Sequence, residues 1–346
     1  MKHKYCIYGI GELGKKVVDL ILDNNDEVVA IYELTPKLDY YRGIKILALK
    51  EINNSHLDYP FVIAVWNPNV DLGALKKDLQ ILGINNILFA GELTNVYQFE
   101  HYIFASRSFI ELNRSKIEEV KNNLDDIKSK EVFERLLLLR QNNDFENKLD
   151  LDNWQYFPND INEIKSLDWI NQVYLDLGAF NGDTLLDIIS KTAGVKYYYG
   201  VEPDDLNAEL LQNTINKNNI EGEVLRVASG SKTGLINFVQ GGGVSSKIAD
   251  LEMINTKQVP LVRFDDFEFK LKPTIIKMDI EGAEKDTLLG LENFIVKSKP
   301  VLMVCLYHKK DDLWEIPLLI KSMRTDYKFY IRQHYPNGLE TVLYCF

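Results

Sequence analysis

The sequence predicts an α/β protein built of two doubly wound domains. Two glycine turns support this prediction, because each follows a short apolar strand and precedes an amphipathic helix. They are Gly9-Ile-Gly11-Glu-Leu-Gly14 near the start of the chain and Gly178-Ala-Phe-Asn-Gly182 in its middle. After the second turn, strand-like and helix-like segments alternate towards the C-terminus. Such alternation is typical of a mostly parallel sheet.

The first turn has the spacing and context of a dinucleotide-binding fingerprint. A strand over residues 4–8 precedes it, an amphipathic run over residues 13–22 follows it, and Glu33 ends the next strand 22 residues after Gly11. Glycines in this pattern allow a tight turn and let a phosphate approach the helix N-terminus. We therefore expect a small Rossmann-like domain over residues 1–105.

Three roles remain open for this first domain. It is similar to the small nucleotide-sugar-binding domain found in front of bacterial sugar-modifying enzymes, which implies a bound nucleotide or nucleotide-sugar. The fingerprint is also compatible with NAD(H) and redox chemistry. In the simplest alternative the glycines serve only the turn, and the domain is kept for packing or for dimerisation.

Residues 106–165 are predicted to form a helical bridge followed by an aromatic loop. Apolar residues recur at three- and four-residue spacing over residues 111–124 and 131–139, without glycine or proline. A cluster of aromatic residues around Tyr156 comes next. This loop either covers the cofactor or acceptor site or docks between the domains.

The second turn lies between two acidic strand ends. A buried strand over residues 173–177 carries Asp176, and the next strand ends at Glu202, which lies 26 residues after Asp176. An acid before the turn suits a ligand with a cationic amino acid part, such as S-adenosylmethionine, and Glu202 can accept both ribose hydroxyls. Gly178 and Gly182 enclose three residues and no third glycine follows, which departs from the dinucleotide fingerprint. The pattern predicts a nucleoside site.

A third stretch gathers candidate catalytic side chains. A buried strand over residues 274–278 is followed by Asp279 and Glu281, and the next strand delivers Tyr307 and His308. In doubly wound sheets, ligands bind in the crevice at the carboxyl ends of the strands. We therefore expect these side chains to face one site.

The most specific motif of the chain is Ile276-Lys-Met-Asp-Ile-Glu-Gly-Ala-Glu284. Together with the second turn, Glu202-Pro203 and Ala228-Ser229-Gly230, it resembles the FkbM family of S-adenosylmethionine-dependent methyltransferases. The resemblance covers about half of the chain, from residue 173 to the C-terminus. It implies a class I methyltransferase fold over residues 166–346. It also implies an O-methyltransferase that acts on a hydroxyl of a sugar, a glycan or a related small molecule.

The resemblance also implies a set of site residues. Those expected to bind the cofactor lie in the second turn, at the next two strand ends and after the strand over residues 274–278: Asp176, Gly178, Ala179, Phe180, Asn181, Gly182, Asp183, Thr184, Glu202, Pro203, Ala228, Ser229 and Asp279.

The catalytic candidates are Asp279, Glu281 and His308. A general base that takes the proton of the acceptor hydroxyl speeds methyl transfer. His308 has the pKa best suited to this task near neutrality, although a single histidine is also commonly a hydrogen-bonded structural residue. Asp279 and Glu281 would alternatively suit a magnesium ion. Two carboxylates alone do not define such a site, so no metal is expected.

Two further segments complete the predicted C-terminal domain. Residues 327–332 and 341–346, joined through Pro336-Asn-Gly338, are predicted to form a hairpin that gives the sheet an antiparallel edge. The glycine-rich segment 241–246 is interpreted as a mobile loop over the acceptor or as a simple flexible turn.

Two other functions compete with methyl transfer. One is a nicotinamide-dependent oxidoreductase that uses the first domain, and the other is a non-catalytic scaffold that binds a nucleotide-sugar. The chain offers no obvious hydride-transfer apparatus beyond the fingerprint. The acids Asp176, Glu202, Asp279 and Glu281 disfavour an inert scaffold. The sequence leaves open the identity of the acceptor and whether the chain forms a homo-oligomer.

Composition narrows the partners and the compartment. The chain has 346 residues and a formal net charge of −11, which argues against a nucleic-acid partner, since such proteins usually carry basic patches. No apolar run approaches the ~20 residues of a membrane-spanning helix. The first residues lead straight into a strand instead of a signal peptide, so we expect a cytoplasmic protein. The dispersed Cys6, Cys305 and Cys345 are interpreted as reduced core thiols.

Overall fold

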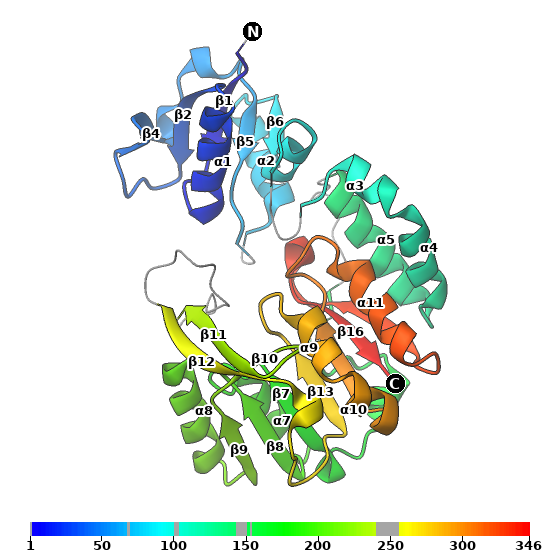
Figure 1. Cartoon of the computed structure of the whole chain (residues 1–346). Helices are drawn as coiled ribbons and strands as arrows, with labels where there is room; N and C mark the ends of the chain where they lie inside the picture. Colours follow the sequence, from blue (N-terminus) through cyan, green and yellow to red (C-terminus); the bar gives the residue numbers. More distant parts are fainter. Residues whose placement is uncertain (1, 68–69, 100–103, 143–150, 153, 240–255) are drawn as a thin grey trace. The chain divides into compact units, whose positions relative to one another are not determined.

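The computed structural model describes residues 2–67, 70–99, 104–142, 151–152, 154–239 and 256–346 (Figure 1). The chain divides into two compact units. The first comprises Met1–Arg114, Glu134–Leu151 and Tyr335–Leu339, and the second comprises Ser115–Phe133, Asp152–His334 and Glu340–Phe346. The glycine-rich segment 241–246 lies outside the described residues.

Unit 1 is built on a six-stranded sheet in the order β3-β4-β2-β1-β5-β6. All neighbouring strands in it are parallel except β3 and β4. The strands are β1 (Lys4–Tyr8), β2 (Glu27–Glu33), β3 (Tyr40–Tyr41), β4 (Ile44–Ala48), β5 (Phe61–Ile63) and β6 (Ile87–Phe89). Unit 1 also contains helices α1 (Glu12–Asp23), α2 (Leu72–Ile81) and α3 (Arg107–Leu112). The core of unit 1 includes Ile7 of β1 and Val17 of α1, which are fully buried.

The glycine turn of unit 1 connects β1 to α1. Gly9 has a φ of +99°, and a Cβ atom on Gly14 would lie 2.1 Å from the carbonyl oxygen of Gly9. Both positions therefore require glycine. The Glu33 carboxylate, at the end of β2, accepts a hydrogen bond of 2.6 Å from the backbone N–H of Ile10. This bond attaches the turn to the neighbouring strand.

Unit 2 is built on a seven-stranded sheet in the order β15-β16-β14-β13-β7-β8-β9. Strands β7 (Val173–Leu177), β8 (Tyr197–Val201), β9 (Gly222–Leu225), β13 (Ile275–Met278) and β14 (Val301–Cys305) are parallel to their neighbours in this group. Strand β16 (Thr341–Cys345) pairs antiparallel with β14 and with β15 (Phe329–Gln333). Mixed α/β architecture with predominantly parallel sheets, as predicted from the sequence, is confirmed.

Unit 2 also contains further helices and a second sheet (Figure 1). The helices are α6 (Asn162–Lys165), α7 (Asp183–Lys191), α8 (Asp205–Lys217), α9 (Glu284–Gly290), α10 (Glu292–Ser298) and α11 (Asp312–Met323). A separate three-stranded sheet has the order β10-β12-β11, with β10 (Ala228–Ser229), β11 (Gly234–Val239) and β12 (Thr256–Val262).

The segment predicted as a helical bridge contains helices, but their lengths differ from the predicted ones. The expected helix over residues 111–124 is divided into α3 and α4 (Arg114–Asn123), while α5 (Ile127–Asn142) is longer than the expected 131–139. The residues of α5 are shared between the two units, since the boundary falls between Phe133 and Glu134.

No helix within the described ranges is long and apolar enough to cross a membrane.

The switch point in the strand order of the unit 2 sheet lies between the parallel strands β7 and β13. From β7, the strands β8 and β9 follow on one side, whereas β13 and β14 lie on the other. Ligands bind at such switch points in doubly wound sheets, outside the carboxyl ends of the strands. Here the backbones after β7 and β13 approach closely: a Cβ atom on Gly178 would lie only 1.8 Å from the carbonyl oxygen of Asp279.

We predict that Gly178→Ala strongly destabilises the chain. Gly178 has a φ of +80°, and forcing a residue with a side chain into that region costs about 1–3 kcal/mol before any clash is counted. The clash with the Asp279 backbone adds to this loss, since the N–H of Asp279 donates a hydrogen bond of 3.0 Å to the carbonyl oxygen of Leu177 and a shift of this backbone would break it. Urea unfolding of the variant should show a midpoint well below that of the wild type.

Gly234→Ala is the matched control for this measurement. Gly234 has no atom within 4 Å of an added Cβ, and its backbone has no positive φ. Its substitution should leave the midpoint nearly unchanged. Equal stability of the two variants would contradict the close approach of the two strand ends.

Candidate functional site

Unit 2 has a cavity of about 340 Å³ at the switch point of its sheet. It extends from the carboxyl ends of β7 and β8 to the residues that follow β13 and β14. The residues lining it are Gln155, Tyr156, Gly178, Phe180, Asp183, Thr184, Asp187, Val201, Glu202, Pro203, Asn207, Val227, Ala228, Ser229, Phe238, Lys277, Asp279, Ile280, Glu281, Ala283, Tyr307 and Glu340.

Glu202 holds the glycine turn from the end of β8. Its Oε2 accepts a hydrogen bond of 2.9 Å from the N–H of Phe180, and its Oε1 accepts one of 2.9 Å from the N–H of Asp204. Phe180 has a φ of +46°, so its backbone adopts an uncommon left-handed conformation in the turn. Burial raises the pKa of Glu202 to about 7. Each oxygen of the carboxylate keeps a lone pair for a ligand hydroxyl.

The helix after β8 brings a further polar group to the cavity. Asp204 caps α8, because its Oδ1 accepts hydrogen bonds from the N–H groups of Leu206 and Asn207. Asn207 is 2% exposed and lines the cavity. Its Oδ1 has no hydrogen-bond partner among the described residues. A buried polar atom without a partner is costly, so this oxygen suits a ligand that donates a hydrogen bond.

Asp176 occupies a different environment from the one expected. Its fully buried carboxylate lies 2.9 Å from Nζ of Lys277 and accepts a hydrogen bond of 2.6 Å from the Tyr198 hydroxyl. It is not among the residues that line the cavity. Lys277 also donates a hydrogen bond of 2.7 Å to the carbonyl oxygen of Gly178. In contrast to the expectation that Asp176 faces a cationic ligand, the structure pairs its carboxylate with a lysine of the neighbouring strand.

Asp279 lies between two tyrosines at the other end of the cavity. The hydroxyls of Tyr156 and Tyr307 lie 3.1 Å from its Oδ2 and Oδ1, respectively. Burial alone would raise the pKa of this carboxyl, but Lys277, His308 and the two hydroxyls hold it below its ordinary value. Asp279 is therefore ionised at neutral pH and accepts hydrogen bonds.

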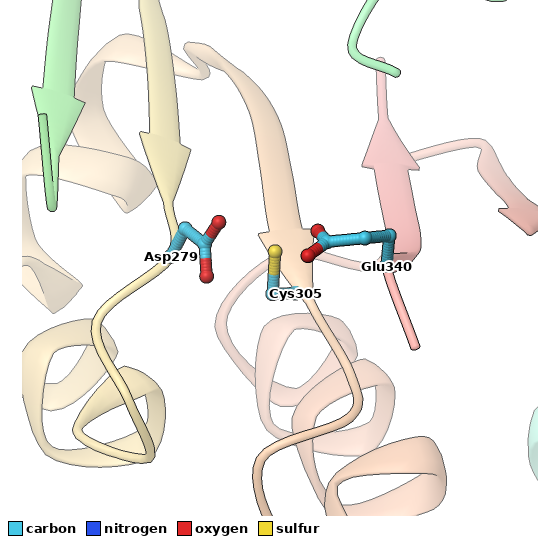
Figure 2. Close-up of side chains that lie close together, drawn as sticks. All are labelled: Asp279, Cys305 and Glu340. Atoms are coloured by element: carbon cyan, nitrogen blue, oxygen red, sulfur yellow. The ribbon is translucent and has the colours of Figure 1, made fainter. Parts of the chain in front are cut away.

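Glu340 is a second carboxylate at this end of the cavity, and no sequence motif indicated it. Figure 2 shows its side chain pointing towards Cys305 and Asp279. The Tyr307 hydroxyl lies 3.1 Å from Oε1 of Glu340, and the Gln155 amide donates to Oε2. Burial and the nearby charge of Asp279 raise the pKa of Glu340 to about 7.

His308 does not suit the role of general base for which it was the best candidate. Its Nδ1 lies 2.8 Å from Oε1 of Glu284, while its Nε2 lies 3.4 Å from Oδ1 of Asp279 and 4.0 Å from Oε2 of Glu281. Burial alone would lower the pKa of His308, but the three carboxylates raise it to about 10. At neutral pH the imidazole is protonated and cannot accept a proton. His308 is also not among the lining residues.

One cluster of possible metal ligands is present among the described residues. Single ligand atoms of Asp279, Cys305 and Glu340 lie within 4.8 Å of one another (Figure 2). Burial raises the pKa of the Cys305 thiol well above its ordinary value, so a metal ion that bound here would have to displace the thiol proton. The tyrosine hydroxyls already bind both carboxylates. We therefore assign no metal to this cluster.

The structure brings most of the predicted site residues together. Those that line the cavity are Gly178, Phe180, Asp183, Thr184, Glu202, Pro203, Ala228, Ser229, Asp279 and Glu281. Those that are not among the lining residues are Asp176, Ala179, Asn181, Gly182 and His308. Sequence reasoning missed Gln155, Asn207 and Glu340, which belong to no motif. It also left Lys277 without a role, although this lysine stands within the most specific motif.

Most of the residues that line this cavity lie in a segment that matches a known family, whereas Gln155, Tyr156 and Glu340 lie outside it. Residues 176–329 match the family model described as the methyltransferase FkbM domain. The match covers less than half of the chain and confirms the resemblance over that segment. No curated protein matches the chain at a significant level.

Solved structures resemble the chain to different extents. The crystal structure of methyltransferase FkbM from Methylobacillus flagellatus KT superposes with a TM-score of 0.77 at 20% identity, over 99% of this chain and 90% of that chain. This likeness shows the fold. A putative rRNA methylase from Clostridium thermocellum has a TM-score of 0.35 at 9% identity, over 53% of this chain and 90% of its own. A putative methyltransferase from Streptococcus mutans in complex with SAH has a TM-score of 0.31 at 10% identity, over 51% of this chain and 89% of its own.

We predict that His308→Gln destabilises the chain most at low pH. The pKa of His308 is raised in the folded state, so its contribution is complete below the unfolded value of about 6.5 and is lost as the pH rises towards 10. At about 1.4 kcal/mol per pKa unit, the difference in unfolding free energy between wild type and variant should amount to a few kcal/mol at pH 6. Urea unfolding from pH 6 to pH 10 should show this difference shrinking.

His334→Gln is the matched control for the pH dependence. His334 is also buried, but burial lowers its pKa to about 4, so it is neutral in both states above pH 7. The difference between wild type and this variant should therefore stay constant between pH 7 and pH 10. A constant difference for His308→Gln as well would show that His308 is not an imidazolium.

Proposed function

We propose that the chain is an S-adenosylmethionine-dependent O-methyltransferase whose C-terminal domain has the class I methyltransferase fold. One observation carries this proposal: Asp279 and Glu202, which binds the glycine turn, line the same cavity. Both residues lie within the segment that matches the FkbM domain. A parallel sheet ending in an antiparallel pair agrees with the fold implied by the resemblance.

The residues around β7 and β8 suit a nucleoside. Glu202 presents carboxylate oxygens, and Asn207 presents the buried Oδ1 that lacks a partner, so both can accept the hydroxyl hydrogens of a ribose. Val227, Ala228 and Phe238 provide an apolar wall for a purine ring. When bound, S-adenosylmethionine supplies an electrophilic methyl group on a sulfonium centre.

The residues after β13 and β14 suit a hydroxyl acceptor. Asp279, Tyr307 and Glu340 offer hydrogen-bonding oxygen atoms to one part of the cavity. Lys277 is the one basic side chain among the described lining residues, and it is already paired with Asp176. An acceptor that carries a phosphate or carboxylate next to the reacting hydroxyl would therefore meet repulsion. We infer a neutral acceptor, such as a sugar or a glycan.

Unit 1 is proposed to serve substrate placement as a small Rossmann-like domain. Its glycine turn and Glu33 have the shape of a nucleotide site, and Gly11 has open space around its Cβ position. A nucleotide-sugar bound there would help to select the acceptor. The competing redox function would require NAD(H) at the same turn.

Substitution of Glu202 tests the cofactor assignment. Glu202→Gln should weaken S-adenosylmethionine binding, measured by calorimetry, by about tenfold or more, because hydrogen bonds to charged groups are worth about 1.5–3 kcal/mol each. Glu33→Gln is the matched control, since Glu33 makes the equivalent bond to the turn of unit 1, and it should leave this affinity unchanged. Affinity that survives in Glu202→Gln would refute the assignment, and absence of binding to the wild type would refute the proposed function.

Substitution of Gly11 tests the role proposed for unit 1. Nothing lies within 4 Å of an added Cβ at Gly11, so Gly11→Leu should fold while its side chain obstructs the approach of a phosphate. Calorimetry with uridine diphosphate glucose and guanosine diphosphate mannose should show that binding of a nucleotide-sugar is lost and that S-adenosylmethionine binding persists. Hydride transfer to NAD by the wild type, abolished in this variant, would instead establish the oxidoreductase.

A further inference from the structure

We propose that Glu340 is the residue that takes the proton from the acceptor hydroxyl. This inference rests on the methyl transfer proposed above and adds a catalytic residue that belongs to no recognised motif. Glu340 immediately precedes β16, the antiparallel strand beside β14, and its carboxylate lines the cavity.

The geometry around Glu340 joins it to Asp279. The Tyr307 hydroxyl lies 3.1 Å from Oε1 of Glu340 and 3.1 Å from Oδ1 of Asp279. One oxygen of each carboxylate lies within 4.8 Å of the other, a separation that allows one hydroxyl group to contact both. Asp279 can therefore orient the acceptor while Glu340 receives its proton.

The backbone at Glu340 supports a functional role. Its φ is +51°, a region that residues with side chains seldom occupy. Such strain persists where surrounding structure fixes it, and it is concentrated at functional sites. Here the carbonyl oxygen of Glu340 accepts a hydrogen bond of 3.1 Å from the N–H of His334, and the Gln155 amide holds Oε2. The backbone and the carboxylate of Glu340 are thus each held by a hydrogen bond, and Tyr307 contacts the other carboxylate oxygen.

The charged and titratable groups facing Glu340 are less suited to accept a proton. From the end of β13, Lys277 is cationic and Asp279 has a lowered pKa, so Asp279 is a weak base. From β14 and the residues after it, the pKa values of Cys305 and Tyr307 are raised well above their ordinary values, and His308 is protonated already.

Tyr156 and Glu281 also line the same cavity as Glu340. In the segment before β7, the Tyr156 hydroxyl is protonated because burial raises its pKa. Glu281, after β13, is 40% exposed. By contrast, burial and Asp279 bring the pKa of Glu340 to about 7, where a base is both deprotonated and effective near neutrality.

The proposed step conserves atoms and charge. The acceptor oxygen forms a bond to the methyl carbon, and the methyl–sulfur bond breaks with its electron pair remaining on sulfur. The proton of the acceptor hydroxyl moves to Glu340, which becomes neutral. The sulfonium charge is thereby balanced by loss of the carboxylate charge. Release of the proton to solvent restores Glu340.

The first test measures the proton affinity of Glu340 directly. Carbon-13 carboxyl spectra of glutamate-labelled wild type and Glu340→Gln, each saturated with S-adenosylhomocysteine, should differ by one titrating signal. We expect its midpoint between pH 6 and 8. A midpoint below pH 5 would overturn the proposal whatever the acceptor is.

The second test measures methyl transfer. Labelled S-adenosylmethionine is incubated with a mixture of methyl glucoside, mannoside, rhamnoside and fucoside, and the products are followed from pH 5.5 to 9. Glu340→Gln should lower kcat by about 10²-fold or more, remove the limb of the wild-type profile near pH 7 and leave S-adenosylmethionine affinity within about twofold of the wild-type value.

Glu163→Gln is the matched control, since Glu163 also binds a tyrosine hydroxyl, that of Tyr330 at 3.0 Å, away from the cavity. It should keep the wild-type profile. A wild-type rate and pH profile in Glu340→Gln would overturn the role of Glu340 and leave the methyltransferase intact. Failure of the wild type to bind S-adenosylmethionine would overturn the proposed function itself.

Discussion

The buried ion pair between Asp176 and Lys277 is the interaction on which the organisation of the candidate site depends. It joins β7 to β13, the two parallel strands on either side of the switch point of the sheet. Burying two charges is costly unless their remaining polar atoms are satisfied. Tyr198 binds the carboxylate, and the carbonyl oxygen of Gly178 binds the ammonium group. The pair thereby attaches the glycine turn to the strand that presents Asp279, so the two halves of the cavity form as one structure.

The balance of charge in the cavity explains how its carboxylates differ. Six acidic residues line it, namely Asp183, Asp187, Glu202, Asp279, Glu281 and Glu340, against one lysine. Lys277 and the protonated His308 lie close to Asp279 and stabilise its negative charge. Glu202 and Glu340 have less compensation, so burial dominates and their pKa values rise to about 7. Similar residues thus differ in their affinity for a proton through their distance from two cations. A methyl-transfer site can use this difference, because orienting a hydroxyl and removing its proton require carboxylates of unequal basicity.

The two units use the same bond for their glycine turns. In unit 1 the carboxylate at the end of β2 accepts a hydrogen bond from the N–H of Ile10, and in unit 2 the carboxylate at the end of β8 accepts one from the N–H of Phe180. An acid at the second strand end therefore stabilises the turn even before any ligand binds. This double role limits what an acid in a fingerprint proves, since a turn anchor and a ribose ligand give the same sequence pattern. In unit 2 the adjoining cavity and the unpaired Asn207 oxygen favour a ligand.

The sequence alone determined the α/β class, the glycine turns and the strand ends at which the cavity lies, because these depend on local conformation and on periodicity along the chain. It also identified the segment that matches the FkbM domain. The tertiary structure decided which acids face the cavity and in which protonation state. Asp176 pairs with Lys277 across the sheet and is not among the residues that line the cavity, and the pKa of His308 is raised because Glu284, Asp279 and Glu281 surround it. Glu340 joined the site from a strand end more than 30 residues after His308. Such properties arise from burial and from charges distant in sequence, which no local pattern of residues encodes.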